Sequence, residues 1–323
     1  MSHSIADTQI ERAFIVASPR SGTTWLQLLL AQHPAVATAQ ETHLFDRYLG
    51  PLERAWRGEL SNPTPRRVGL CNALSEDEFY ALCRTFATRV LDNILASKRG
   101  ARVVVEKSPG HVRYWKLILR LFPDAHFVHI VRDPRGVVAS MQNAGRSWGS
   151  RWAPTNAYGC ARRWREAVEE GRRIAAEAPC YHELRYESLL ADGERCLAEL
   201  FGFLGIEADP EFYRAALEAC AIGNLQAASE RVASPWKLAR EPGGFYRKGE
   251  AESWREELSR KDLRAVEYVT RALMAELGYE PALERTRGKP LSLAARETVR
   301  PARDRLASAL HRVVRRLSSD GRS

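Results

Sequence analysis

A short polar loop between an apolar run and a helical segment constrains this chain more than any other feature. The β-branched run at 14–16 reads as a buried strand, and the segment from Trp25 to Gln32 reads as a helix. A strand, a tight loop and a helix in this order point backbone N–H groups and a positive helix end at an anion. The loop therefore predicts a phosphate site, and its candidate ligands are Arg20, Ser21, Gly22, Thr23 and Thr24.

The loop differs from the ATP- and GTP-binding loop in the place of its cation. The Walker pattern has Lys directly after the last Gly, whereas this chain has Thr23 there and carries Arg20 two residues before Gly22. The loop is therefore expected to serve another phosphate donor.

The rest of the chain alternates between strand-like and helix-like segments. Four β-type runs, at 12–17, 102–106, 126–131 and 180–185, are expected to form a parallel sheet. The alternation predicts an α/β, P-loop-like three-layer fold, with a central parallel sheet flanked by helices and ligands at the carboxyl ends of the strands. Helices are expected at 23–32, 76–98, 111–121, 134–144, 156–177, 186–204, 209–220, 251–257 and 261–277.

The segment Ser18-Pro-Arg-Ser-Gly-Thr-Thr-Trp-Leu26 resembles the 5′-phosphosulfate loop of sulfotransferases that use 3′-phosphoadenosine 5′-phosphosulfate (PAPS). The family usually has Lys where this chain has Arg20. The resemblance implies that the loop binds the phosphosulfate. Trp25 would then offer a stacking face for adenine, although a role in the core is an equal alternative.

Three further segments resemble the same family, and the resemblance covers residues 12 to about 260. Arg132 and Ser140, in FVHIVRDPRGVVASM, match the pair that binds the 3′-phosphate, and Tyr186 matches a tyrosine that contacts adenine. GFYRKGEAESW resembles the family's Arg-Lys-Gly loop over the same phosphate. The family often has a second Gly before the Trp of this motif, which is missing here. The implied ligands in this loop are Arg247, Lys248 and Gly249.

The resemblance also implies the catalytic residues. Lys107 matches a lysine near the transferring group. Pro109 stands where the cytosolic sulfotransferases of animals have their catalytic His, so this chain lacks that base. In tyrosylprotein, carbohydrate-type and many bacterial members a Glu after the first helix is the base, and Glu41 lies in that place. His43 and His111 are the alternatives.

The sequence thus predicts a bacterial-type sulfotransferase, closer to the Glu-base group than to the His-base group. Sulfuryl transfer from PAPS to an acceptor hydroxyl or amine would use Glu41, Arg20 and Lys107, and no metal is expected. A nucleoside-triphosphate-dependent small-molecule kinase and a non-catalytic nucleotide-binding relative are the alternative functions. The acceptor, whether a small molecule, glycan or lipid, would contact variable loops at 42–70, 143–158 and 221–243, whose candidate stacking residues are Trp56, Trp148, Trp152, Tyr158 and Trp236.

Positive charge is concentrated at the C-terminal end. The net charge is +9, and Ala282–Ser323 holds eleven Arg and Lys against four Asp and Glu, which leaves about +2 for the remainder. We therefore expect a sulfotransferase domain at 1–283 and a basic, partly amphipathic tail at 284–323. The alternatives for the tail are contact with an anionic membrane or a partner, docking on its own domain, and a frayed helix. No basic stripe with interleaved aromatics crosses the body, so no nucleic-acid partner is expected.

Other sequence features bear on location and on the loops. The six cysteines show no paired spacing, no secretory signal is visible, and no stretch approaches the ~18 apolar residues of a membrane span. A cytoplasmic protein is expected, of undetermined oligomeric state. The segment 50–65 is predicted to be a loop or lid over the site, and 221–250 a long functional loop.

Overall fold

Five parallel strands form the centre of the protein, in the order β2-β3-β1-β4-β5. The structure is a computed structural model that describes residues 11–61, 68–228, 245–246 and 249–283. The strands are β1 (Glu11–Val16), β2 (Val36–Thr38), β3 (Val103–Lys107), β4 (His126–Val131) and β5 (Cys180–Arg185). The predicted α/β fold is confirmed, with one strand, β2, added beside β3 that the four predicted runs did not include.

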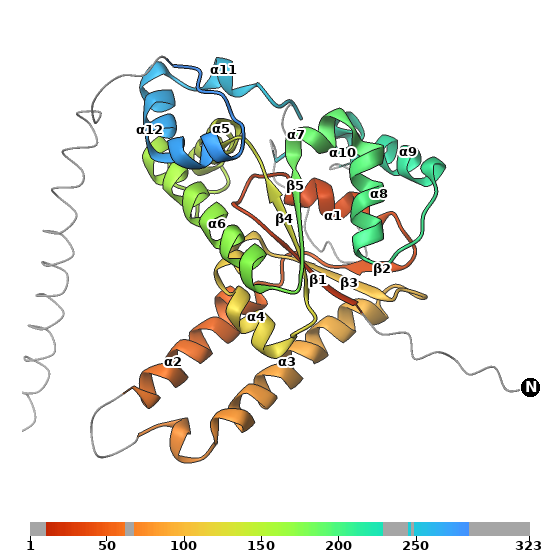
Figure 1. Ribbon diagram of the computed structural model, residues 1–323, viewed down its shortest axis with the longest axis vertical. Coiled ribbons are helices and arrows are strands. Elements are labelled where there is room, and N and C mark those ends of the chain that lie inside the picture. The colour runs from red at the N-terminus through yellow and green to blue at the C-terminus, as the bar shows by residue number, and fades with distance from the viewer. Residues whose placement is uncertain (1–10, 62–67, 229–244, 247–248, 284–323) are drawn as a thin grey trace, which may run out of the picture.

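Helices cover both faces of the sheet, as Figure 1 shows. On one face α1 (Thr23–Ala31), α7 (Tyr186–Ala191), α8 (Gly193–Phe203) and α9 (Pro210–Ala219) lie together, and α10 (Ile222–Ala228) follows them. The other side carries α3 (Glu76–Ala96), α4 (Trp115–Leu121), α5 (Pro134–Arg146), α6 (Ala157–Glu177) and α12 (Arg260–Glu276), with the short α11 (Trp254–Glu257) near α5.

The alternation of side chains along β1 explains why both faces are covered. Phe14 and Val16 belong to the apolar cluster under α3 and α4, whereas Ala13 and Ile15 belong to the cluster under α1 and α8. A strand buried on both faces reads as a continuous apolar run. This is the pattern that predicted a parallel sheet.

The predicted lid at 50–65 is wrong over the part that the structure describes. Residues Gly50–Leu60 form helix α2, which continues a π-helical turn at Leu44–Leu49. Trp56 is only 2% exposed and stacks on Phe79, with ring centroids 4.3 Å apart. Burial of this indole ties α2 to α3, so the segment is a structural hairpin.

Most other predicted helices are confirmed, with two changes. The expected helix at 186–204 is divided into α7 and α8 at Asp192, and the expected helix at 111–121 begins as a 3₁₀ turn at Pro109–Arg113. Within the predicted loop at 221–250, Ile222–Ala228 is helical. The tail at 284–323 and residues 229–244 lie outside the described residues.

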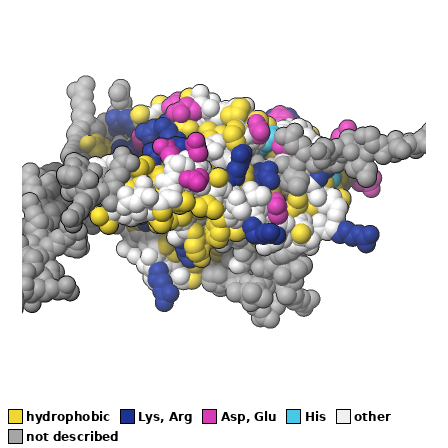
Figure 2. Space-filling view, turned by 90° about the horizontal axis from the view of Figure 1, so that it is seen from below, with side chains coloured by type: hydrophobic (Ala, Val, Ile, Leu, Met, Phe, Trp, Pro, Cys, Tyr) yellow, Lys and Arg dark blue, Asp and Glu magenta, His cyan; other side chains and the backbone are white. Residues whose placement is uncertain are grey.

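The hairpin of α2 and α3 extends away from the sheet at the lower end of Figure 1. Figure 2, seen from below, shows hydrophobic side chains interspersed with Lys and Arg on this face. No helix among the described residues is both long and apolar enough to cross a membrane.

Candidate active site

Most predicted ligands in the described part of the chain lie at or just after the end of a strand, at the carboxyl edge of the sheet, whereas Ser140 lies on α5 and Gly249 between α10 and α11. The loop with Arg20 follows β1, Lys107 ends β3, Arg132 follows β4, and Tyr186 follows β5. Parallel strands bring such residues to one edge. The sheet order therefore places residues from four strands around a single site.

The phosphate loop turns sharply because two of its residues adopt left-handed backbone angles. Arg20 has φ 73°, and Gly22, which precedes α1, has φ 99°. A Cβ atom on Gly22 would lie 2.6 Å from Cδ2 of Tyr186, so both the backbone angle and the space require glycine. No side chain among the described residues caps the first N–H groups of α1, which leaves them for an anion.

Arg20 links the loop to the predicted 3′-phosphate residue on α5. Its Nε donates to Oγ of Ser140 at 3.0 Å, and a terminal nitrogen donates to the Phe245 carbonyl at 2.7 Å. The guanidinium also lies over the rings of Trp148 and Phe245, at 5.3 and 4.6 Å from their centroids. Phe245 is two residues before Arg247 and Lys248, which lie outside the described residues.

Arg132 approaches the same loop from β4. It donates to the Arg20 carbonyl at 3.4 Å, and its guanidinium lies 4.2 Å from the centroid of the Tyr186 ring. A further donation, at 3.2 Å, reaches the carbonyl of Glu250, directly after Gly249. Arg132 thus contacts both predicted phosphate segments.

Two buried donors in this region have no hydrogen-bond partner within the described part of the chain. They are Oγ of Ser21, in a residue only 1% exposed, and Nε of Arg132. A buried polar atom without a partner is costly. Arg132 lines the cavity, so its unpartnered Nε fits a phosphate group of the nucleotide, whereas Ser21 does not line the cavity.

Trp25 and Tyr186 form the predicted adenine side. Their rings meet edge to face with centroids 5.7 Å apart, and the Trp25 indole donates to the Cys220 carbonyl at 3.0 Å. Trp25 is partly buried and Tyr186 is buried, and both line the cavity. Trp25 packs against the core cluster under α1 and α8 and also lines the cavity, and its contact with adenine stays a prediction.

One continuous cavity of about 1480 Å³ spans the site. Trp148 and Trp152, two of the predicted stacking residues, line it, whereas Trp56 is in the core and Trp236 lies outside the described residues. Tyr158 packs beside the cluster under α5 and α12 and is not part of the lining. The predicted site residues that line the cavity are Arg20, Gly22, Thr23, Thr24, Trp25, Glu41, Lys107, Arg132, Ser140, Tyr186 and Gly249.

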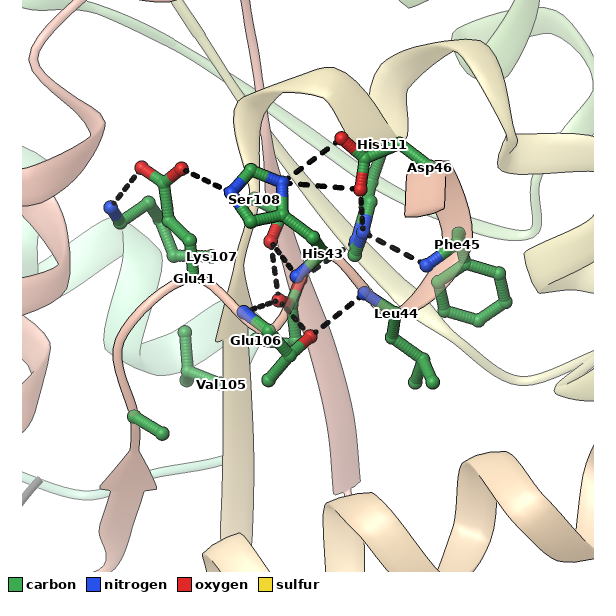
Figure 3. Close-up of polar contacts among 12 residues, drawn as sticks. Glu41, His43, Leu44, Phe45, Asp46, Val105, Glu106, Lys107, Ser108 and His111 are labelled. Carbon is green, nitrogen blue, oxygen red and sulfur yellow. Dashed lines mark hydrogen bonds and ion pairs between the residues drawn. The ribbon is translucent and has the colours of Figure 1, made fainter. Parts of the chain in front are cut away.

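Glu41 and Lys107, the predicted base and cation, are in contact, as Figure 3 shows. Nζ of Lys107 donates to Oε1 of Glu41 at 2.7 Å and to Oγ1 of Thr24 at 3.3 Å. On the other side of the carboxylate, Nε2 of His43 lies 3.5 Å from Oε2 of Glu41. One lysine therefore joins the phosphate loop to the carboxylate, and the carboxylate is held from two sides.

A network of histidines and carboxylates continues from Glu41 into the interior, partly buried at His43 and Asp46 and buried at His111 and Glu106. Nδ1 of His43 lies 3.0 Å from Asp46, Nε2 of His111 lies 3.6 Å from the same carboxylate, and Nδ1 of His111 lies 2.8 Å from Glu106. His111 is fully buried, and Glu106 is 2% exposed. Sequence reasoning missed Asp46 and Glu106. The sequence held a signal for Glu106. In the run RVVVE, this charged residue directly follows three valines of a strand that is expected to be buried.

The network shifts the pKa values of its members away from their ordinary values. Burial alone would raise the pKa of Glu106, but the His111 imidazole and the hydroxyls of Ser108 and Thr42 lower it to about 2. Burial likewise opposes a charged His111, but Glu106 and Asp46 raise its pKa to about 9. Burial is also outweighed at Asp46, where His111 and His43 lower the carboxyl pKa.

Among the residues that the structure describes, no group of three or more His, Cys, Asp or Glu side chains is arranged to hold a metal ion.

Comparison with known proteins decides the family. The model of the sulfotransferase family matches residues 12–210. This chain belongs to the sulfotransferase family. The match confirms the prediction, made from the phosphate loop, of an enzyme of the PAPS-dependent sulfotransferase family.

Individual relatives of this sulfotransferase come from bacteria and animals. The nodulation protein NoeE of Sinorhizobium fredii is 26% identical over 304 residues, which cover 85% of this chain and 67% of NoeE. Protein-tyrosine sulfotransferase 2 of Gallus gallus is 30% identical over 200 residues, which cover 60% of this chain and 50% of that protein. The chain thus spans about half the length of the protein-tyrosine sulfotransferases.

Solved structures show the same fold. The sulfotransferase domain of the Synechococcus PCC 7002 olefin synthase has a TM-score of 0.55 and 20% identity, covering 87% of this chain and 99% of the domain. Mouse sulfotransferase SULT7A1, solved in complex with PAP, has a TM-score of 0.51 and 15% identity over 84% of this chain and 88% of its own. At these levels of sequence identity, the structural similarity shows a shared fold and nothing more specific.

Proposed function

We propose that this protein transfers the sulfuryl group of PAPS to an acceptor hydroxyl or amine, with Glu41 as the general base. The observation that carries the proposal is the position of Lys107, whose ammonium contacts Thr24 of the phosphate loop and Glu41 at once. A donor bound at the phosphate loop and an acceptor that gives its proton to Glu41 would therefore both lie beside Lys107.

The residues of the loop and of β4 support binding of the donor at both of its phosphate groups. The open N–H groups at the start of α1, with Arg20 and Ser21, would hold the phosphosulfate. Arg132 and Ser140 would hold the 3′-phosphate, with Arg247, Lys248 and Gly249 closing over it. Trp25 and Tyr186 would contact the adenine ring.

The transfer itself would be a single in-line displacement. The acceptor oxygen gives its proton to Glu41 and forms a bond to sulfur, while the bond from sulfur to the bridging phosphate oxygen breaks and that oxygen keeps the electron pair. Arg20 and Lys107 lie where charge builds on the leaving oxygen. Positioning and electrostatic stabilisation would therefore supply most of the rate enhancement.

The two alternative bases differ in their access to the cavity. His111 is fully buried against Glu106 and does not line the cavity, which argues against contact with an acceptor. His43 lines the cavity beside Glu41, and its other ring nitrogen faces Asp46. Glu41 has the better access, with a side chain that is 36% exposed, and it is the base that we propose.

We propose the acceptor as a chemical class, a compound with a free hydroxyl or amine group. Protein-tyrosine sulfotransferases are among the relatives, which favours testing phenolic hydroxyls, and small-molecule, glycan and lipid hydroxyls remain in the proposed range. Trp148 and Trp152 on the cavity wall, with centroids 5.7 Å apart, suit stacking on a ring or a sugar.

Thermal stability in the presence of nucleotides tests the donor. We expect 3′-phosphoadenosine 5′-phosphate (PAP) to raise the melting temperature, and ADP and ATP with Mg²⁺ to have little effect. A screen of tyrosine peptides, phenols, glycans and lipid alcohols with radiolabelled PAPS would follow. Stabilisation by ATP with Mg²⁺ alone would support the kinase alternative instead, and PAP binding without transfer to any acceptor or to water would support a non-catalytic relative.

A further inference from the structure

Glu106 is an unusual residue for the position that it occupies. It lies in β3 beside Lys107, in a strand whose residues are all buried, and it is only 2% exposed. Placing a carboxylate in a protein interior costs several kcal/mol unless partners compensate, and such pairs seldom stabilise a fold. We therefore expect the Glu106 carboxylate, which lies next to Lys107, the proposed catalytic lysine, to have a role in the active site.

The partners of Glu106 lie on the segment that carries Glu41 and on the segment that follows β3. Its Oε1 accepts from the Thr42 hydroxyl at 2.7 Å and from the Thr42 N–H at 3.3 Å, directly after Glu41. It also accepts from the Ser108 hydroxyl at 2.7 Å, and Ser108 Oγ in turn accepts the His43 N–H at 3.1 Å. One carboxylate oxygen therefore fixes the two residues that follow Glu41, Thr42 directly and His43 through Ser108.

His111 holds the other end of the same segment. Its Nδ1 lies 2.8 Å from Glu106, and its Nε2 lies 3.6 Å from the Asp46 carboxylate. In the neutral ring Nε2 also accepts a hydrogen bond from the Phe45 N–H, with 3.1 Å between the two nitrogens. Asp46 then faces His43, which faces Glu41. The backbone needs this support because His43 has a left-handed φ of 53°, an angle that a non-glycine residue seldom adopts.

From these contacts we infer that Glu106 and His111 are positioning residues, which hold the segment Glu41–Asp46 so that the Glu41 carboxylate faces Lys107 and the cavity (Figure 3). Glu106 and Lys107 are neighbours on one strand. The strand thereby sets both the place of the lysine and, through Glu106, the place of the base. This inference rests on the proposed function of Glu41.

A second contact between a buried histidine and a carboxylate, here a partly exposed one, offers a control. His129 on β4 lies 3.4 Å from Glu183 on β5, and neither residue lines the cavity. Glu183 also has its pKa lowered to about 2, against the effect of burial, by His129 and Arg172. Glu106→Gln and Glu183→Gln thus each remove a carboxylate that faces a buried histidine, close to the site in one case and away from the cavity in the other.

The kinetic test measures turnover of radiolabelled PAPS, with water and with para-nitrophenol as acceptors, and PAP affinity by calorimetry. We expect Glu106→Gln to lower kcat about 100-fold, the effect of a displacement near 1 Å at a reacting group, with PAP affinity changed less than about twofold. Glu183→Gln is expected to leave both values unchanged. His111→Gln is the second variant if Glu106→Gln folds poorly, and retained PAP affinity shows that a variant is folded.

A double-mutant cycle separates positioning from general stability. If Glu106 acts through Glu41, then Glu106→Gln lowers the rate little further in a Glu41→Gln background. Additive losses would overturn the inference, and so would equal losses of kcat in Glu106→Gln and Glu183→Gln.

A crystal structure of Glu106→Gln gives a readout that needs no turnover. We expect the Glu41 carboxylate to have left the contact with Lys107. An unchanged contact would overturn the inference, whether or not the protein sulfates an acceptor. Failure of the wild-type protein to turn over PAPS, by contrast, would count against the proposed function.

Discussion

Lys107 and Glu41 form an ion pair of 2.7 Å between the end of β3 and the segment after β2. The same ammonium lies 3.3 Å from Thr24 at the start of α1. Three segments far apart in the sequence thus meet at one nitrogen atom. The predictions below depend on this junction and on the network that supports it.

Glu41→Gln is expected to lower kcat by about 10²–10⁴-fold, because the amide cannot accept the acceptor's proton. PAP affinity should change little, since Glu41 contacts the donor side only through Lys107. Steady-state kinetics with radiolabelled PAPS and calorimetry with PAP check the two values. If kcat stays within about threefold of wild type, Glu41 is not the base, and His43→Gln becomes the variant to measure.

Arg20→Ala is expected to weaken PAP binding by an order of magnitude or more, because a hydrogen bond to a charged group contributes ~1.5–3 kcal/mol. Arg20→Lys should recover part of the loss, since the family usually has Lys there. Calorimetric titration with PAP gives the affinities. Arg57→Ala is the control, because Arg57 is exposed on α2 and pairs with Glu53. Equal affinities for the Arg20→Ala and Arg57→Ala variants would contradict the placement of the phosphate.

Trp56→Ala is expected to cost ~3–5 kcal/mol of unfolding free energy, as for other large aromatic residues removed from a core. Its indole stacks on Phe79 and is nearly inaccessible to solvent. Chemical denaturation measures the loss. Trp148→Ala, on the cavity wall, is the contrasting variant and should mainly change acceptor kinetics. A stable Trp56→Ala protein with altered kinetics would restore the interpretation of this segment as a lid.

The Glu106–His111 pair is expected to make stability depend on pH in two windows. The pKa of His111 is raised to about 9, so its contribution is complete below about pH 6.5 and is lost as pH rises through 9. The pKa of Glu106 is lowered to about 2, so its contribution is present above about pH 4.5 and is lost as pH falls toward 2.

Melting temperatures of wild type and Glu106→Gln across this pH range test the linkage. The difference between the two proteins should be largest between about pH 4.5 and 6.5 and should shrink toward pH 9 and toward pH 2. If the difference in melting temperature stayed constant with pH, the charge on His111 would not depend on Glu106.

The resemblance of four short segments predicted the site residues, and three of the four segments join a strand to the loop or helix after it. Local order fixes where such a residue lies relative to its own strand, and parallel strands bring their carboxyl ends to one edge. The structure accordingly brings Arg20, Lys107 and Arg132 to one cavity. Local patterns failed where burial depends on remote partners, as for Trp56, whose polar neighbours suggested a lid and whose stacking partner, Phe79, lies 23 positions away.

The sequence by itself determined the α/β class, the phosphate loop and the family, because these follow from short-range periodicity and from residue types at fixed local spacing. Only the tertiary structure decided what surrounds Glu41. Asp46, Glu106 and His111 come from two segments about 60 residues apart, and no local pattern encodes their pairing. Their charges became one network because β2 pairs with β3 and brings the segment after each strand to the same edge of the sheet.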